Sequence, residues 1–225
     1  MQVALIIPAL DEAVVIGDVV RRVPRATISE VIVVDNGSTD GTADVATRAG
    51  ARVVVEPRRG YGAACWAGVQ ALEPDVDVAA FLDGDGSQRP EELPDVLAPM
   101  LRGEADLVLG ARGGGSHHPP HAVLGTRLVA GFVALRYSVR LTDLGPFRAI
   151  RVDLLRRLGM RDRGFGWPVE MVVKAAALRA RIVEVEVTQA PRAGGQSKVS
   201  GTVTGSVRAG VAFVSTAVRA ARDVS

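Results

Sequence analysis

The first half of the chain alternates short apolar runs with segments that have a helical pattern. We expect strands at Val3–Ile7, Val31–Val34, Val53–Val55, Val78–Leu82 and Leu107–Leu109. The helices expected between them lie at about Glu12–Val23, Asp40–Ala49, Tyr61–Leu72 and Glu91–Leu101. Continuous Val, Ile and Leu strands separated by helices are typical of a mostly parallel sheet with both faces covered. The pattern therefore predicts an α/β fold with a doubly wound sheet and helices on both faces.

The second half is less regular. A helix is expected over Ala122–Val139, where arginines occur without any acidic residue. That helix fits either an ordinary core position or an interfacial position against anionic lipid. The later elements expected are a strand near Phe147–Ile150, helices at about Val152–Leu158 and Pro168–Ala180, a strand at Ile182–Val187, a basic glycine-rich loop at Pro191–Gly201 and a final amphipathic helix.

Composition limits the classes of function. The chain has 225 residues, 48% of them apolar and 23% charged, as expected for one folded domain with a sizeable core. A formal net charge of +2 is too small to indicate nucleic acid binding. The start of the sequence lacks a signal-peptide pattern, and no apolar stretch reaches the ~20 residues of a spanning helix. We expect a cytoplasmic protein, or one held at the inner face of a membrane.

The sequence Asp83-Gly84-Asp85 closes the fourth predicted strand. Residues two apart on an extended chain point the same way, and glycine permits close approach of another group. Mg²⁺ typically takes one or two carboxylates together with substrate phosphates. The tripeptide therefore suits a divalent cation held against a diphosphate, although a plain surface turn has the same composition.

Other polar segments follow the first three strands, at Pro8–Glu12, Asp35–Thr42 and Arg58–Gly62. Ligands of doubly wound sheets bind at the carboxyl ends of the strands, so these segments predict a nucleotide site. The carboxylate of Asp35 could accept a hydrogen bond from a ring N–H of the nucleotide base. Gly60 would let the following helix N-terminus approach an anion.

These segments, with Gly60–Ala64 and Asp83–Asp85, resemble the motifs of family 2 glycosyltransferases, which have the GT-A fold. Later motifs resemble the polyprenyl-phosphate branch, typified by dolichyl-phosphate mannose synthase: Gly110–Arg112, Thr142-Asp143, Phe147–Ala149, Glu170, and Arg192 with Gly195–Lys198. The resemblance covers roughly residues 1–202. It implies a nucleotide-sugar-binding half at 1–110, an acceptor-binding half at 111–202 and a separate C-terminal helix at 203–225.

The resemblance implies an inverting, metal-dependent transfer of a sugar from a UDP- or GDP-linked donor to a polyprenyl phosphate. The donor would be bound by Pro8, Ala9, Asp11, Glu12, Asp35, Gly60, Asp83, Arg192 and Lys198. Mg²⁺ or Mn²⁺ would be bound by Asp83, Asp85 and Ser87. The acceptor would be bound by Arg112, Arg127 and Glu170. Catalysis would involve Asp85, Asp143, Arg127 and Arg148.

The chain departs from the family pattern at several of these positions. Asp11 stands where Asn is usual, Asn36 where a second Asp is common, and Ser87 where close relatives have Gln. Asp143 and Glu170 are the candidate bases if the acceptor is a hydroxyl. Two alternative functions therefore stay open: transfer to a soluble or protein hydroxyl, and a catalytically weak nucleotide-sugar-binding protein that works within a complex.

Overall fold

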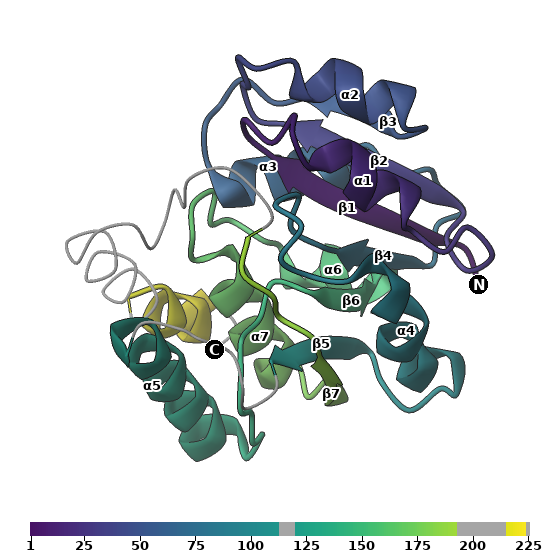
Figure 1. Ribbon diagram of the computed structural model, residues 1–225. Helices are drawn as coiled ribbons and strands as arrows, with labels where there is room; N and C mark the ends of the chain where they lie inside the picture. Colours follow the sequence, from purple (N-terminus) through teal and green to yellow (C-terminus); the bar gives the residue numbers. More distant parts are fainter. Residues whose placement is uncertain (113–119, 193–214, 224–225) are drawn as a thin grey trace.

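The computed structural model describes residues 1–112, 120–192 and 215–223. They fold around a seven-stranded sheet with the strand order β3-β2-β1-β4-β6-β5-β7 (Figure 1). The strands are β1 (Val3–Ala9), β2 (Glu30–Asp35), β3 (Arg52–Val55), β4 (Val78–Phe81), β5 (Leu107–Arg112), β6 (Arg148–Arg151) and β7 (Ile182–Val187). The helices are α1 (Ile16–Arg21), α2 (Thr42–Arg48), α3 (Tyr61–Gln70), α4 (Leu93–Leu101), α5 (Pro120–Tyr137), α6 (Val152–Leu158) and α7 (Trp167–Ala177), with a 3-10 turn η1 (Pro90–Glu92) before α4.

The sheet is mostly parallel, as the sequence predicts, but β6 runs antiparallel to both β4 and β5. Element boundaries differ from the expected ones by a few residues in most cases. The largest difference is at the first helix, which begins at Ile16 instead of Glu12. Asp11 has a positive φ of 52°, and the backbone N–H of Val15 donates to the Glu12 carbonyl in a turn. The chain after β1 therefore forms a loop with a defined turn before α1 begins.

Two hydrophobic cores lie on opposite faces of the sheet. Along β1, Ala4 and Ile6 belong to one core, and the alternate residues Val3, Leu5 and Ile7 belong to the other. The first core is covered by α3, α6, α7, part of α5 and the helical residues 215–223. The second is covered by α1, α2 and α4. Because the central strands are buried on both faces, they read as continuous apolar runs.

The strand register brings the polar strand ends to one edge of the sheet. Ala9 at the end of β1 pairs with Asp35 at the end of β2, and Ile6 of β1 pairs with Phe81 at the end of β4. The turn after β4 also packs closely on the end of β1, because a Cβ placed on Gly84 would lie 3.2 Å from the carbonyl oxygen of Pro8. The loops after β1, β2 and β4 therefore surround one region.

Residues 162–164 form a support beneath the start of α3. Their backbone accepts hydrogen bonds from Gly62 N to the Gly164 carbonyl (3.0 Å) and from Ala63 N to the Arg163 carbonyl (2.9 Å). A Cβ on Gly62 would lie 2.6 Å from the carbonyl oxygen of Asp162. The glycine is therefore required by close backbone packing between two segments about 100 residues apart in the chain.

We predict that Gly62→Ala lowers the free energy of unfolding by about 1–3 kcal/mol, because backbone atoms and not a flexible side chain obstruct the new methyl group. Gly131→Ala in α5 is the matched control, because a Cβ there meets nothing within 4 Å. That variant should gain roughly 0.5–1 kcal/mol from the helix preference of alanine. Urea unfolding of the two variants measures both values, and a Gly62→Ala protein as stable as the wild type would contradict the packing argument.

Candidate active site

Asp85 is a buried carboxylate whose orientation is fixed by its own turn. Its Oδ1 accepts hydrogen bonds from the backbone N (2.9 Å) and the hydroxyl (2.6 Å) of Ser87. Its Oδ2 lies 2.9 Å from Nε of Arg192. The sequence analysis assigned Ser87 as a metal ligand. In the structure the Ser87 hydroxyl instead donates to Asp85, so we revise its role to positioning that carboxylate.

Asp83 is the second acid of the turn, and one of its oxygens is unusual. Its Oδ1 is buried and has no hydrogen-bond partner among the described residues. Burial, and then the neighbouring charge of Asp85, raise the pKa of Asp83 to about 7. A buried carboxylate oxygen beside a second carboxylate is an incomplete arrangement, because buried polar atoms normally have partners.

These two carboxylates fit a divalent cation. In the described part of the chain, no group of three or more His, Cys, Asp or Glu side chains could hold a metal ion. Asp83 and Asp85 would therefore act as a pair, with the remaining positions filled by substrate phosphate and water. This donor set suits Mg²⁺ or Mn²⁺, which are commonly bound by one or two carboxylates together with phosphates.

Hydrogen bonds between side chains and backbone join the loops after β1 and β2. Asp11 N donates to Ser38 Oγ (2.9 Å), Glu12 N donates to Thr42 Oγ1 (2.9 Å), and Thr39 N donates to Asp11 Oδ1 (2.8 Å). Neither Ser38 nor Thr42 was identified from the sequence as joining the two loops, because the partners lie 27 and 30 residues apart. These hydrogen bonds hold the predicted nucleoside-binding acids in a fixed arrangement.

The remaining predicted nucleoside-binding residues lie on the same edge. Pro8 and Ala9 end β1, and the Ala9 carbonyl accepts a hydrogen bond from Asn36 N (2.9 Å). Asp35 is buried, with its Oδ1 bonded to the backbone N of Ser38 (2.9 Å). The carboxylate of Asp35 therefore faces the loop after β2, at the edge to which β1 and β4 also lead.

Gly60 is predicted to let the helix N-terminus approach an anion, but its own N–H already has a protein partner. Gly60 N donates to Asn36 Oδ1 (2.8 Å), and Gly62 N and Ala63 N bond to the backbone of residues 163–164. Asn36 Nδ2 also donates to the carbonyls of Glu56 and Arg58, both at 2.9 Å. Three N–H groups at the start of α3 thus bond to protein groups, and Gly60 allows close backbone packing against Arg163.

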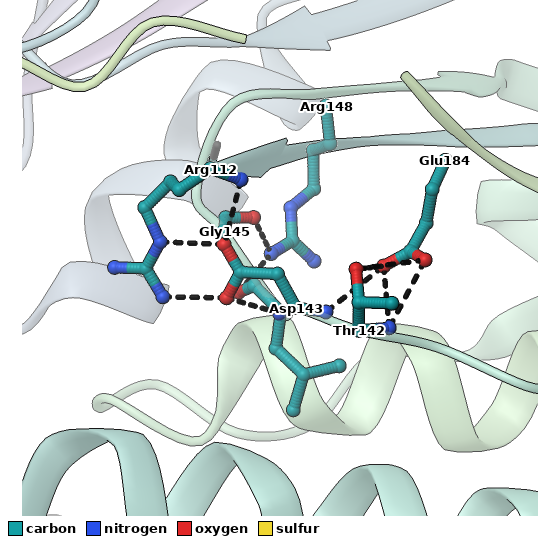
Figure 2. Close-up of polar contacts among 7 residues, drawn as sticks. Arg112, Thr142, Asp143, Gly145, Arg148 and Glu184 are labelled. Atoms are coloured by element: carbon teal, nitrogen blue, oxygen red, sulfur yellow. Dashed lines mark hydrogen bonds and ion pairs between the residues drawn. The ribbon is translucent and has the colours of Figure 1, made fainter. Parts of the chain in front are cut away.

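Farther along the same edge of the sheet, at the end of β5, Arg112 and Asp143 form a close ion pair, drawn in Figure 2. Both Arg112 Nε to Asp143 Oδ2 and Arg112 Nη2 to Asp143 Oδ1 measure 2.5 Å. Burial disfavours the charged form of Asp143, but the hydrogen bonds and charge of Arg112 outweigh it and hold the pKa of that carboxyl below its usual value. Asp143 is therefore a bound carboxylate and a poor proton acceptor.

Glu184 of β7 organises the loop that carries Asp143 (Figure 2). Its carboxylate accepts hydrogen bonds from Thr142 N, Asp143 N and the Thr142 hydroxyl, the two backbone bonds at 2.9 Å. The sequence predicts the strand at Ile182–Val187 but not this role of Glu184. A strand pattern carries no information about contacts with a loop 41 residues away.

Arg148, which the resemblance assigned to catalysis, is buried and bonded to backbone carbonyls in the structure. The side chain is 1% exposed and donates to the carbonyls of Leu144 (3.1 Å), Gly145 and Pro168 (3.1 Å). Figure 2 shows its guanidinium beside the loop segment that contains Gly145. Arg148 therefore holds the backbone of the loop after α5 and is enclosed by it.

Glu170 is likewise buried, which corrects its predicted contact with the acceptor. It is 3% exposed, pairs with Lys174 Nζ at 2.7 Å, and accepts hydrogen bonds from the backbone N atoms of Arg161 (2.9 Å) and Asp162 (2.7 Å). Its charge is thus committed to α7 and to the support beneath α3. Glu170 fixes the 161–164 segment and has no carboxylate oxygen left to serve as a base.

The three remaining basic residues differ in position. Arg192 lies at an acidic cluster formed by Glu12, Asp83 and Asp85. Its Nη1 is 3.6 Å from Oε1 of Glu12, in addition to the Asp85 contact. Arg127 is exposed on α5, between Arg112 and Asp143 in the sequence. Lys198 lies outside the described residues, as do parts of the predicted basic loop and C-terminal segment.

Known proteins share both sequence and fold with this chain. The model of glycosyl transferase family 2 matches residues 4–159. An uncharacterized glycosyltransferase of Mycobacterium tuberculosis is 42% identical over 207 residues, with 91% of this chain and 93% of the relative covered. An undecaprenyl-phosphate mannosyltransferase of Micrococcus luteus is 35% identical over 224 residues, with 91% and 90% covered.

A solved structure extends the comparison to the fold. Glucosyl-3-phosphoglycerate synthase from Mycobacterium tuberculosis, in complex with Mn²⁺, uridine diphosphate and glucosyl-3-phosphoglycerate, has a TM-score of 0.75 and 25% sequence identity to this chain. The match covers 96% of this chain and 80% of that one. The expected α/β fold of the GT-A type is thereby confirmed.

The raised pKa of Asp83 predicts a pH-dependent stability of the metal-free protein. A carboxyl whose pKa rises on folding stabilises the fold below its unfolded pKa, and that contribution is lost as the pH rises through about 7. Asp83→Asn removes the charge, so the variant should be more stable than the wild type by roughly 2 kcal/mol at pH 8 and show no such gain near pH 4.

Thermal unfolding in the presence of a chelator measures this difference. Asp75→Asn, which alters an exposed carboxylate in the turn before β4, is the control and should show no gain at pH 8. Added Mn²⁺ should stabilise the wild type and not Asp83→Asn. A stability difference that is the same at pH 5 and pH 8 would contradict the electrostatic account of Asp83.

Proposed function

The chain belongs to glycosyl transferase family 2, and from this premise we propose that it moves a sugar from a nucleoside diphosphate to a polyprenyl phosphate. The transfer is proposed to invert the anomeric centre and to take place at the cytoplasmic face of a membrane. The donor side is the edge formed by the loops after β1, β2 and β4. The acceptor side is the region of Arg112 at the end of β5.

The observation that carries the choice of acceptor is the state of the candidate bases. Asp143 accepts two hydrogen bonds from the guanidinium of Arg112, and Glu170 is buried against Lys174. A hydroxyl acceptor needs a group to take its proton, whereas a phosphate is already anionic near neutral pH. Two bound carboxylates therefore favour a phosphate acceptor. The similarity to an undecaprenyl-phosphate mannosyltransferase gives independent support.

On the donor side, the acids divide into two groups. Asp11, Glu12 and Asp35 would bind the nucleoside, because carboxylates accept hydrogen bonds from ribose hydroxyls and from base N–H groups. Asp83 and Asp85 would hold a divalent cation against the diphosphate. When bound, that cation would neutralise the negative charge of the departing nucleoside diphosphate. The Mn²⁺ and uridine diphosphate in the similar solved structure support this division.

On the acceptor side, arginines supply the charge that a phosphate requires. Guanidinium groups bind phosphate through paired, charge-assisted hydrogen bonds. Arg112 is held in place by Asp143, so its orientation is set before the acceptor arrives. Arg127 on α5 is the second arginine that we assign to the acceptor phosphate, since α5 follows β5 in the chain and contains no acidic residue.

The outer face of α5 suits the membrane at which a lipid acceptor would be found. Leu128 and Leu135 are 55% and 90% exposed, and Arg127 and Arg136 are exposed beside them. In Figure 1, α5 lies at the periphery, beside α7 and the end of the described chain. No helix in the described ranges is long and apolar enough to cross a bilayer. We propose that this face lies on anionic lipid headgroups.

A second candidate function is transfer to a hydroxyl of a small phosphorylated acceptor. The observation that favours it is the fold similarity to glucosyl-3-phosphoglycerate synthase bound to glucosyl-3-phosphoglycerate. Arg112 would bind the acceptor phosphate in that reaction too. The two candidates differ in whether lipid is required.

We predict that Mn²⁺-dependent turnover of a panel of UDP- and GDP-sugars rises at least tenfold when a short-chain polyprenyl phosphate is added. The measurement is release of the nucleoside diphosphate together with detection of the glycosylated lipid. Stimulation by 3-phosphoglycerate instead would support the second candidate. Tight donor binding without turnover in either case would indicate a nucleotide-sugar-binding protein.

We also predict that Leu135→Glu lowers binding to vesicles of anionic lipid by at least fivefold, because it places a charge of the wrong sign on the exposed face of α5. Leu101→Glu, on another exposed leucine (61% exposed) at the end of α4, is the control and should bind like the wild type. Co-sedimentation with vesicles measures both. Equal loss in the two variants would contradict a membrane contact through α5.

A further inference from the structure

Arg192 lies across the acidic cluster formed by Glu12, Asp83 and Asp85. Its Nε is 2.9 Å from Oδ2 of Asp85, and its Nη1 is 3.6 Å from Oε1 of Glu12. The side chains of Asp85 and Glu12 are each 7% exposed, whereas that of Arg192 is 32% exposed. A partly exposed arginine therefore reaches down onto two buried carboxylates that belong to different loops.

The contact has a clear electrostatic cause. Glu12, Asp83 and Asp85 lie around one region at the carboxyl edge of the sheet, and buried like charges repel one another strongly. Without a cation, a positive group must offset that repulsion. Arg192 is the group that does so for Asp85 and Glu12, and it uses the same Oδ2 atom of Asp85 that Ser87 leaves unbonded.

From these contacts we infer that Arg192 takes the place of the divalent cation until a donor binds and couples cation binding to diphosphate binding. Arg192 must release Oδ2 of Asp85 before that oxygen can ligate a metal ion. The released guanidinium can then pair with the incoming diphosphate. The inference rests on the proposed donor chemistry and adds to it an exchange of partners at one named atom.

The exchange has a thermodynamic consequence that a purely structural arginine would not have. A metal ion alone must compete with Arg192 for Asp85, so it binds weakly. A metal ion together with a diphosphate binds cooperatively, because the diphosphate gives the displaced guanidinium a new partner. Such a coupling is reciprocal, since each ligand must raise the affinity of the other by the same factor. Arg192 is therefore a positioning residue for cation and donor together.

The test is a titration of the whole protein with Mn²⁺, alone and with saturating UDP or GDP. We expect Arg192→Ala to bind Mn²⁺ alone about fivefold more tightly than the wild type, and the coupling between Mn²⁺ and the diphosphate to fall about fivefold. Arg192→Lys keeps the charge but not the planar fork, so its coupling should lie between the two. Free Mn²⁺, followed by electron paramagnetic resonance, gives the affinity without any measurement of turnover.

Arg151→Ala is the matched control. It removes the same charge at the opposite edge of the sheet, where Arg151 pairs in register with Val78 at the start of β4 and its side chain contacts Asp153. The affinity of Arg151→Ala for Mn²⁺ alone and its coupling between Mn²⁺ and diphosphate should equal those of the wild type. Thermal unfolding of each variant verifies that the fold is intact.

The outcomes separate the inference from the function on which it rests. An unchanged or weakened affinity of Arg192→Ala for Mn²⁺ alone would overturn the inference, and so would unchanged coupling. In either case the wild type would still bind Mn²⁺ and diphosphate, and the proposed donor chemistry would stand. A wild type that binds neither diphosphate with Mn²⁺ would overturn the proposed function, and the inference with it.

Discussion

The repulsion between buried carboxylates at the exit of β4 is the constraint on which the rest of the site depends. Asp83 and Asp85 are separated by one glycine, and Asp83 has a raised pKa because it is buried beside Asp85. The turn after β4 keeps them together through Ser87, and Gly84 allows that turn to pack on Pro8. A protein keeps such an arrangement at a cost in stability, and a bound cation is the natural way to offset that cost.

The acceptor side follows the opposite principle, because its charges are already paired. Asp143 is bonded to Arg112, and the backbone of the 142–145 loop is bonded to Glu184 and Arg148. Such pairs hold side chains in place and withdraw carboxylates from proton transfer. The carboxylates after β4 are thus left with like charges close together, whereas the charges around Asp143 are paired within the protein.

The fold was largely predictable because its strands are continuous apolar runs whose polar ends lie on one edge. The carboxylates of the donor side could be found for the same reason, since each one follows a strand directly. The supporting contacts could not be found this way. Glu184 meets a loop about 40 residues away, and the backbone around Gly62 meets residues 162–164. Burial also decides the roles of Arg148 and Glu170, and a sequence motif contains no information about burial.

The antiparallel strand β6 joins the two halves physically. It pairs with β4 on one side and with β5 on the other, and Arg148 at its start is in register with both Phe81 and Leu109. Phe81 is two residues before Asp83, and Leu109 is three residues before Arg112. The enclosed guanidinium of Arg148 fixes the loop that carries Asp143, and Asp143 in turn holds Arg112. The insertion of one reversed strand into a parallel sheet thus connects the turn of Asp83 and Asp85 to the end of β5 that carries Arg112.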